Sequence, residues 1–175
     1  MNSTFGNVFL TLLTLGLLAV MALATTSAAA ADTGAQLFVT QAAIGGMAEV
    51  EMGKLAVDKA SSADVKTFAA QMVSDHTKAD EELEKIATGK SLKVPTALDA
   101  EHKAKLEMLR KKIGAEFDKT YVQAQVSGHE KMQQLLDHEA KDGTDADLKT
   151  FAEKTLPTVV QHHQMAKQLE AKLGK

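Results

Sequence analysis

A seven-residue motif occurs twice in this chain, as ADVKTFA at residues 63–69 and as ADLKTFA at residues 146–152. The two copies differ only in having Val65 in one and Leu148 in the other. In each copy the apolar residues stand three and four positions apart, which is the spacing of one face of an α-helix. Each copy also follows another segment with this spacing. The sequence therefore predicts two similar helical hairpins.

Four long helices are predicted from apolar and small residues that recur at steps of three and four, over residues 35–60, 63–88, 115–141 and 145–173. Ser62 is a suitable N-cap for the second helix, since its side-chain oxygen can accept from a free backbone N–H. Pro157 lies inside the fourth helix and lacks a backbone N–H. We expect a kink or a restart there.

A connection at residues 90–114 joins the two hairpins and contains Pro95 and a short helical pattern over residues 99–113. A connection of this length can cross the whole length of a bundle, as in ferritin-like folds. The predicted fold is all-α, a four-helix bundle. A short extra helix lies in the long connection between the second and third helices.

The composition agrees with packed helices and excludes several classes of function. Aromatic residues make up only 4%, and the chain has two prolines. The formal net charge is −3 with acidic and basic residues interleaved, so no nucleic-acid partner is expected. The absence of cysteine excludes disulfides and thiolate metal sites.

The N-terminal part of the chain carries no charged side chain before Asp32. A largely apolar run from Val8 to Ala24 is followed by small residues at 25–31, which is typical of a segment that signal peptidase removes. We predict a signal peptide at residues 1–31 and a bundle domain at residues 32–175, which would be periplasmic or secreted. The alternative is that the apolar run remains as a membrane anchor.

Each long helix carries one ionisable residue on its apolar face: Glu49, His76, His129 and His162. All four lie near the middle of their helices, and bundles build metal sites from inward side chains at one depth. Three imidazoles and a carboxylate suit a divalent transition metal such as zinc, copper or iron. The alternative is that these are hydrogen-bonded structural residues that fix the register of the helices.

Four methionines stand three or four residues from these positions on the same side of each helix: Met52, Met72, Met132 and Met165. Thioether sulfur beside imidazole favours copper, although methionine more often fills a core. No arrangement of Ser, His and Asp typical of nucleophilic catalysis is present in the sequence. The chain is not expected to be an enzyme.

Four segments, one from each predicted helix, resemble a known family: GGMAEVEMGKLA at 45–56, MVSDHTKA at 72–79, GHEK at 128–131 and LPTVVQHHQMA at 156–166. The family is the bacterial domain of unknown function 4142. It is grouped with the ferritin-like superfamily and often labelled a predicted outer membrane protein. The resemblance covers about residues 36–173. It implies a ferritin-like bundle that is usually exported and has no established activity.

Di-iron members of that superfamily carry Glu-x-x-His on two helices, whereas Val73 and Val159 precede His76 and His162 by three residues here. The resemblance therefore does not extend to ferroxidase or oxygenase chemistry. The sequence favours an exported bundle protein of unestablished activity that binds a metal ion or small ligand at mid-bundle in the periplasm. The alternative is a structural or interaction protein of the cell envelope, with an envelope protein as its partner and no metal.

Overall fold

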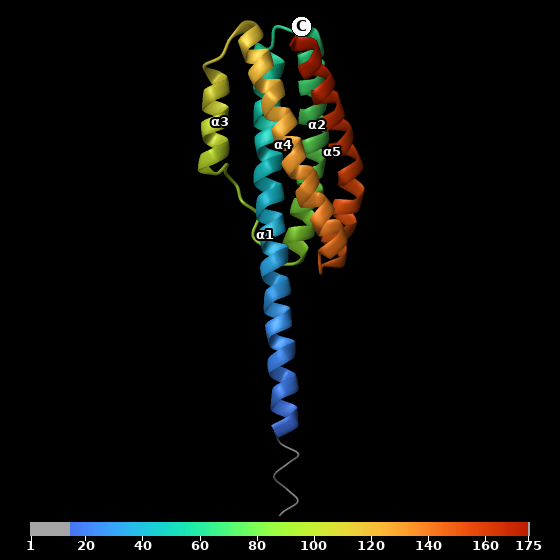
Figure 1. The fold of residues 1–175 in the computed structure, drawn as a ribbon. Helices are drawn as coiled ribbons and strands as arrows, with labels where there is room; N and C mark the ends of the chain where they lie inside the picture. Colours follow the sequence, from blue (N-terminus) through green and yellow to red (C-terminus); the bar gives the residue numbers. More distant parts are fainter. Residues whose placement is uncertain (1–14, 175) are drawn as a thin grey trace, which may run out of the picture.

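The computed structural model describes the backbone of residues 15–174 and the side chains of residues 33–174. Within these residues it contains five helices and no strand (Figure 1), namely α1 (Leu15–Lys59), α2 (Ala63–Gly89), α3 (Ala100–Arg110), α4 (Gly114–Asp142) and α5 (Ala146–Leu173). The predicted all-α fold is confirmed. The ends of α2, α4 and α5 differ from their predicted positions by one residue at most.

The first helix begins at Leu15 rather than near residue 35, and Figure 1 shows it projecting well beyond the other helices. The added segment is rich in alanine, the best helix former, and contains no proline to end the helix. The predicted signal peptide lies partly in residues 1–14, outside the described residues. The rest lies where only the α1 backbone is described, so cleavage stays a prediction. In the described part of the chain, no helix combines the length and apolar character needed to cross a membrane.

The connection between the two hairpins runs the length of the bundle, as predicted. Near its start, the backbone N–H of Lys93 donates to Oε1 of Gln36 on α1 at 2.8 Å. At its end, the side chain of Lys59 at the other end of α1 donates to the backbone carbonyl of Arg110. The crossing makes α1 and α4 neighbours on one side and α2 and α5 neighbours on the other, while α3 packs outside α1 and α4 (Figure 1).

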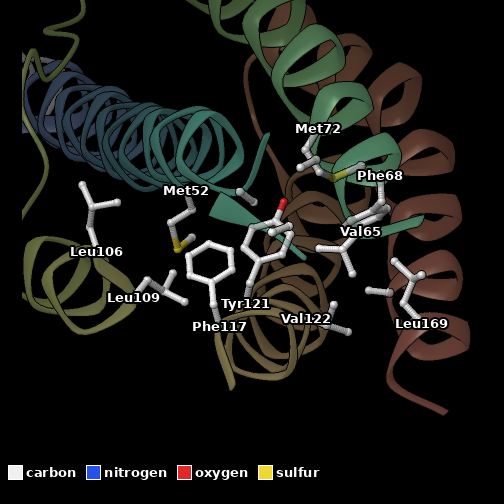
Figure 2. Close-up of a cluster of buried hydrophobic side chains, with 14 of the residues drawn as sticks. Met52, Val65, Phe68, Met72, Leu106, Leu109, Phe117, Tyr121, Val122 and Leu169 are labelled. Atoms are coloured by element: carbon white, nitrogen blue, oxygen red, sulfur yellow. The ribbon is translucent and has the colours of Figure 1, made fainter. Parts of the chain in front are cut away.

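The apolar core forms two clusters, one toward each end of the bundle. Figure 2 shows the first cluster, where Leu106 and Leu109 of α3 extend toward Met52 and Phe117. The second cluster contains Phe38, Val39, Leu83, Leu136, Leu148 and Phe151. Each large apolar side chain removed from water contributes about 1.5–3 kcal/mol before the entropy cost. The short helix α3 is therefore held in place by two leucines of the first cluster.

The repeated motif occupies similar surroundings in the two hairpins. Phe68 of α2 packs edge to face against Tyr121 of α4, with ring centroids 6.3 Å apart and planes at 63°. Phe151 of α5 packs in the same way against Phe38 of α1, with centroids 6.3 Å apart and planes at 70°. Each phenylalanine of the motif thus contacts an aromatic ring of the other hairpin. The repeat in sequence corresponds to a repeat in packing.

The turn between α1 and α2 is fixed by a buried carboxylate from the other hairpin. Asp118 of α4 is 2% exposed and accepts from the backbone N–H groups of Ser61 and Ser62, at 2.9 and 2.8 Å. These contacts satisfy donors that would otherwise be unpaired ahead of α2. They also tie the start of α4 to the start of α2.

Of the kink or restart predicted at Pro157, the restart is wrong, because α5 runs through this residue as one helix. Proline removes one backbone hydrogen bond, to the carbonyl of Glu153. Both residues are exposed, so water can satisfy that carbonyl. The helix therefore continues at a small cost.

Candidate metal centre

Three of the four predicted site residues meet in the middle of the bundle. His76 on α2, His129 on α4 and His162 on α5 are 6%, 1% and 1% exposed. One ring nitrogen of each lies within 4.8 Å of the others, and the ring centroids are 5.5 Å apart in every pair. Along its helix, each histidine lies between residues of the two apolar clusters. We call these three residues the histidine triad; they form a polar layer across the core.

The helical period explains why His162, and not its neighbour, faces inward. His162 follows Val159 by three residues and precedes Ala166 by four, and both of these apolar residues are buried. His163 is only partly buried, and its Nδ1 lies 2.9 Å from Nε2 of Gln133. The face of this helix that was predicted to point inward is therefore correct at His162.

The proton on His129 is fixed by its own helix. Nδ1 of His129 lies 3.0 Å from the backbone carbonyl of Gln125, which can only accept, so Nδ1 carries the hydrogen. This leaves a lone pair on Nε2, which lies 3.4 Å from Nε2 of His76. Donors on a tetrahedral zinc ion with bonds of about 2.0–2.1 Å lie roughly 3.3–3.5 Å apart. The pair is already at the spacing that a shared metal ion requires.

His162 is oriented by a carboxylate that the sequence analysis missed. Nε2 of His162 lies 3.1 Å from Oδ2 of Asp75, and its Nδ1 is buried with no hydrogen-bond partner among the described residues. An ionised carboxylate can only accept, so Nε2 carries the hydrogen and Nδ1 the lone pair. Asp75 is not on the apolar face of α2, which is why the pattern did not single it out. Its position directly before His76 was the available signal.

Glu49 is not brought into the histidine triad. It is buried, and its Oε1 lies 3.9 Å from Nδ1 of His129, the ring nitrogen that already donates to Gln125. Its Oε2 accepts from the side-chain Nε2 of Gln125. The carboxylate also fills space left by Gly128, where an added Cβ would lie 2.9 Å from Oε1. The structure thus brings three of the four predicted residues together as one group and puts Glu49 behind His129.

Burial sets the protonation of these groups. It lowers the pKa of His76 to about 3, with the other two imidazoles adding to the effect, and it lowers the pKa of His129 to about 4. Burial also lowers the pKa of His162, although Asp75 acts in the opposite direction. All three imidazoles are therefore neutral at pH 7, which is the form that binds metal ions. Burial raises the pKa of Glu49 to about 7.

A groove between α2 and α5 reaches two members of the histidine triad, His76 and His162. Its volume is about 290 Å³, and Asp75, His76 and His162 line it together with Lys78 and Lys154. The remaining lining is mostly polar, from glutamines and threonines of the same two helices. An ion can reach the imidazoles from this side, and a further ligand can approach from it.

The four methionines near the site pack with the apolar clusters. Met52 and Met72 are buried in the first cluster, and Met165 packs against it. Met132 packs against the second cluster. These positions match the use of methionine as a core filler.

Comparison with known proteins gives one result. The sequence profile of the family described as "Domain of unknown function (DUF4142)" matches residues 20–169. Searches of curated proteins and of solved structures return no match. The matched range includes all three histidines, Asp75 and Glu49, and it covers most of the chain. The chain therefore belongs to the DUF4142 family.

Proposed function

We propose that this protein binds one divalent transition metal ion through His76, His129 and His162. The observation that carries the proposal is the buried Nδ1 of His162, which has no hydrogen-bond partner in the described part of the chain and belongs to the same group as two other imidazoles. A buried acceptor without a donor costs about 1–3 kcal/mol, and a bound cation would remove that cost. The outer nitrogens of His129 and His162 already have oxygen partners, as is usual for histidines that bind metals.

Zinc and copper fit this ligand set better than iron. Imidazole nitrogen suits zinc, copper and iron, but mononuclear iron sites commonly pair two histidines with a carboxylate. The carboxylate nearest the triad, Asp75, is engaged with the Nε2 hydrogen of His162. Three nitrogen ligands leave a fourth position on a tetrahedral ion, on the side of the α2–α5 groove. The role we favour is binding without turnover of a substrate.

A structural role is the second candidate, and one contact favours it. His76 can donate from Nε2 to Nε2 of His129 at 3.4 Å, so these two side chains satisfy each other without a metal. In that case the polar layer would fix the register of the helices. Replacing a histidine would then change packing and stability but would not affect any metal.

Metal analysis separates the two candidates. We expect protein purified from its native compartment to carry zinc or copper, and the metal-free protein to bind Zn²⁺ in competition with a chromophoric chelator. His129→Ala should weaken binding by at least 100-fold, whereas His138→Ala, which removes an exposed imidazole, should not change it. If both variants lost zinc affinity equally, or if the wild type did not bind zinc at micromolar concentration, the structural role would be the remaining candidate.

Export is part of the proposal and rests on the uncharged apolar N-terminus. We expect the intact mass of the protein from a periplasmic extract to show loss of 30 or 31 residues. A full-length species confined to the membrane fraction would mean that the apolar run is an anchor instead.

A further inference from the structure

A second cavity lies on the opposite side of the bundle, between α1 and α4. The short helix α3 packs outside these two helices on the same side (Figure 1). The volume of the cavity is about 360 Å³, within the range of about 300–1,000 Å³ that is usual for small-molecule sites. The apolar part of its lining consists of Ile44, Met52, Ala124, Met132 and Leu135. Flexible methionine side chains allow such a surface to adapt to an apolar ligand.

Two glycines make room for the groups that line this cavity. A methyl group on Gly45 would lie 2.6 Å from Cε of Met132, and one on Gly128 would lie 2.9 Å from Oε1 of Glu49. Both distances are shorter than side-chain carbons tolerate. The close positions of Met132 and Glu49 therefore depend on glycine in the facing helices.

The charged residues at the mouth of the cavity are already paired with one another. Nζ of Lys105 lies 2.6 Å from Glu101, and Nζ of Lys131 lies 3.6 Å from the same carboxylate. Nδ1 of His102 lies 2.8 Å from Asp99. These pairs leave little net charge at the mouth that would select an anion.

Glu49 is a lining carboxylate that forms no ion pair with a lysine or arginine of the described chain, although Lys105 and His102 are near enough to oppose in part the rise in its pKa that burial causes. It is 6% exposed, and within the described chain Oε1 accepts no hydrogen bond while Oε2 accepts one from Gln125. The Nδ1 hydrogen of His129, 3.9 Å away, is directed to a backbone carbonyl. Oε1 of Gln125 is also buried without a donor. Two side-chain oxygens beside the cavity, Oε1 of Glu49 and Oε1 of Gln125, therefore have no hydrogen-bond donor among the described residues.

We propose that this cavity binds a small organic amine, whose ammonium group contacts Glu49 and whose apolar body lies against Met52, Met132 and Leu135. An ammonium ion supplies both the charge and the donors that a buried carboxylate requires. A carboxylate of the same shape is repelled by Glu49, and an alcohol provides one neutral donor. The site is separate from the histidine triad and does not depend on a bound metal.

Titration calorimetry with phenethylamine tests this site, with phenethyl alcohol and hydrocinnamate as matched ligands of similar shape. We expect the amine to bind at least tenfold more tightly than the alcohol, and the acid not to bind. Glu49→Gln should weaken amine binding at least tenfold and leave zinc binding unchanged. Asp80→Asn is the control, because it makes the same change at an acidic residue that packs against Gly46 and does not line the cavity.

A second variant covers the case in which Glu49→Gln fails to fold. Ala124→Phe fills the cavity from α4 and leaves Glu49 unchanged, and it should abolish amine binding while retaining zinc binding. Three results would overturn the proposal: no amine binding at millimolar concentration, equal amine affinity in the wild type and the folded variants, or equal affinity for hydrocinnamate. None of these results bears on metal binding by the histidine triad.

Discussion

The two hairpins meet along two interfaces, and each interface pairs a carboxylate with a histidine. Between α2 and α5, Asp75 lies 3.1 Å from Nε2 of His162, at the floor of an open groove. Between α1 and α4, Glu49 lies 3.9 Å from Nδ1 of His129, beneath the side that α3 covers. Asp75 is 28% exposed at its side chain, and Glu49 is 8% exposed. The repeated sequence therefore builds two similar hairpins but two different interfaces, one for which we propose a metal ion and one for which we propose an organic amine.

The largest effect that would test this difference concerns the helix that covers α1 and α4. Leu109 of α3 is fully buried, so Leu109→Ala should lower the free energy of unfolding by about 2–5 kcal/mol. Met108→Ala, at an exposed neighbour in the same helix, should cost less than about 0.5 kcal/mol. Urea denaturation measures both. If both variants lost the same small amount of unfolding free energy, α3 would not contribute to the stability of the α1–α4 interface.

The protonation of Glu49 provides the next test. Its pKa is raised to about 7 in the folded protein from 4.5, so the native state holds more protons between these values. The contribution of Glu49 to the unfolding free energy of the wild type therefore falls as pH rises from about 4.5 to 7. At about 1.36 kcal/mol per pH unit the full change is roughly 3 kcal/mol. In Glu49→Gln this contribution is absent, since an amide does not titrate.

Urea titrations of both metal-free proteins at several pH values measure this contribution, because groups common to both cancel in the difference. The stability of Glu49→Gln relative to the wild type should rise by about 2–3 kcal/mol from pH 4.5 to pH 8. Parallel curves would show that Glu49 is not buried as described. The histidines act in the opposite direction: with the pKa of His76 lowered to about 3, its contribution is present above pH 6.5 and is lost on acidification.

A third prediction compares the two carboxylates directly. Asp75→Asn should lower zinc affinity by about 10–100-fold, since partners of metal-bound histidines have effects of that size. Glu49→Gln should change it by less than about threefold, because Nδ1 of His129 keeps its bond to the backbone of Gln125. Chelator competition measures both. The reverse order would place the metal on the α1–α4 side.

The smallest effect is expected at the surface of the open groove. Nζ of Lys154 on α5 lies 2.8 Å from Glu82 on α2, but the lysine side chain is 66% exposed. Exposed ion pairs contribute about 0–1 kcal/mol, so Lys154→Ala should change stability by less than about 0.5 kcal/mol and leave zinc affinity unchanged. A loss above about 2 kcal/mol would show that the groove depends on this pair to stay formed.

Most of the fold could be predicted because it depends on local patterns. The three- and four-residue spacing and the caps gave α2, α4 and α5 to within one residue, and the long connection indicated the crossing. The start of α1 could not be predicted this way. Nothing in the alanine-rich segment ends a helix, so the apolar pattern of the bundle does not mark the boundary.

The candidate site could be predicted only in part. The three- and four-residue spacing of apolar residues identifies the inward face of each helix, and it correctly predicted that all three histidines lie on inward faces. This spacing does not give the direction in which a long side chain turns at an interface. Glu49 was therefore grouped with the histidines. The spacing also cannot find Asp75, which reaches His162 from the edge of α2 across an interface that exists only in the folded bundle.

A crystal structure of the zinc-loaded protein, with the ion located by anomalous scattering, tests the central claim most directly. We predict one fully occupied ion about 2.0–2.2 Å from Nε2 of His76, Nε2 of His129 and Nδ1 of His162. Asp75 should remain bonded to Nε2 of His162, and Glu49 should lie outside the coordination sphere. An ion bound by Glu49, an ion only on surface carboxylates, or no ion at millimolar zinc would contradict the account.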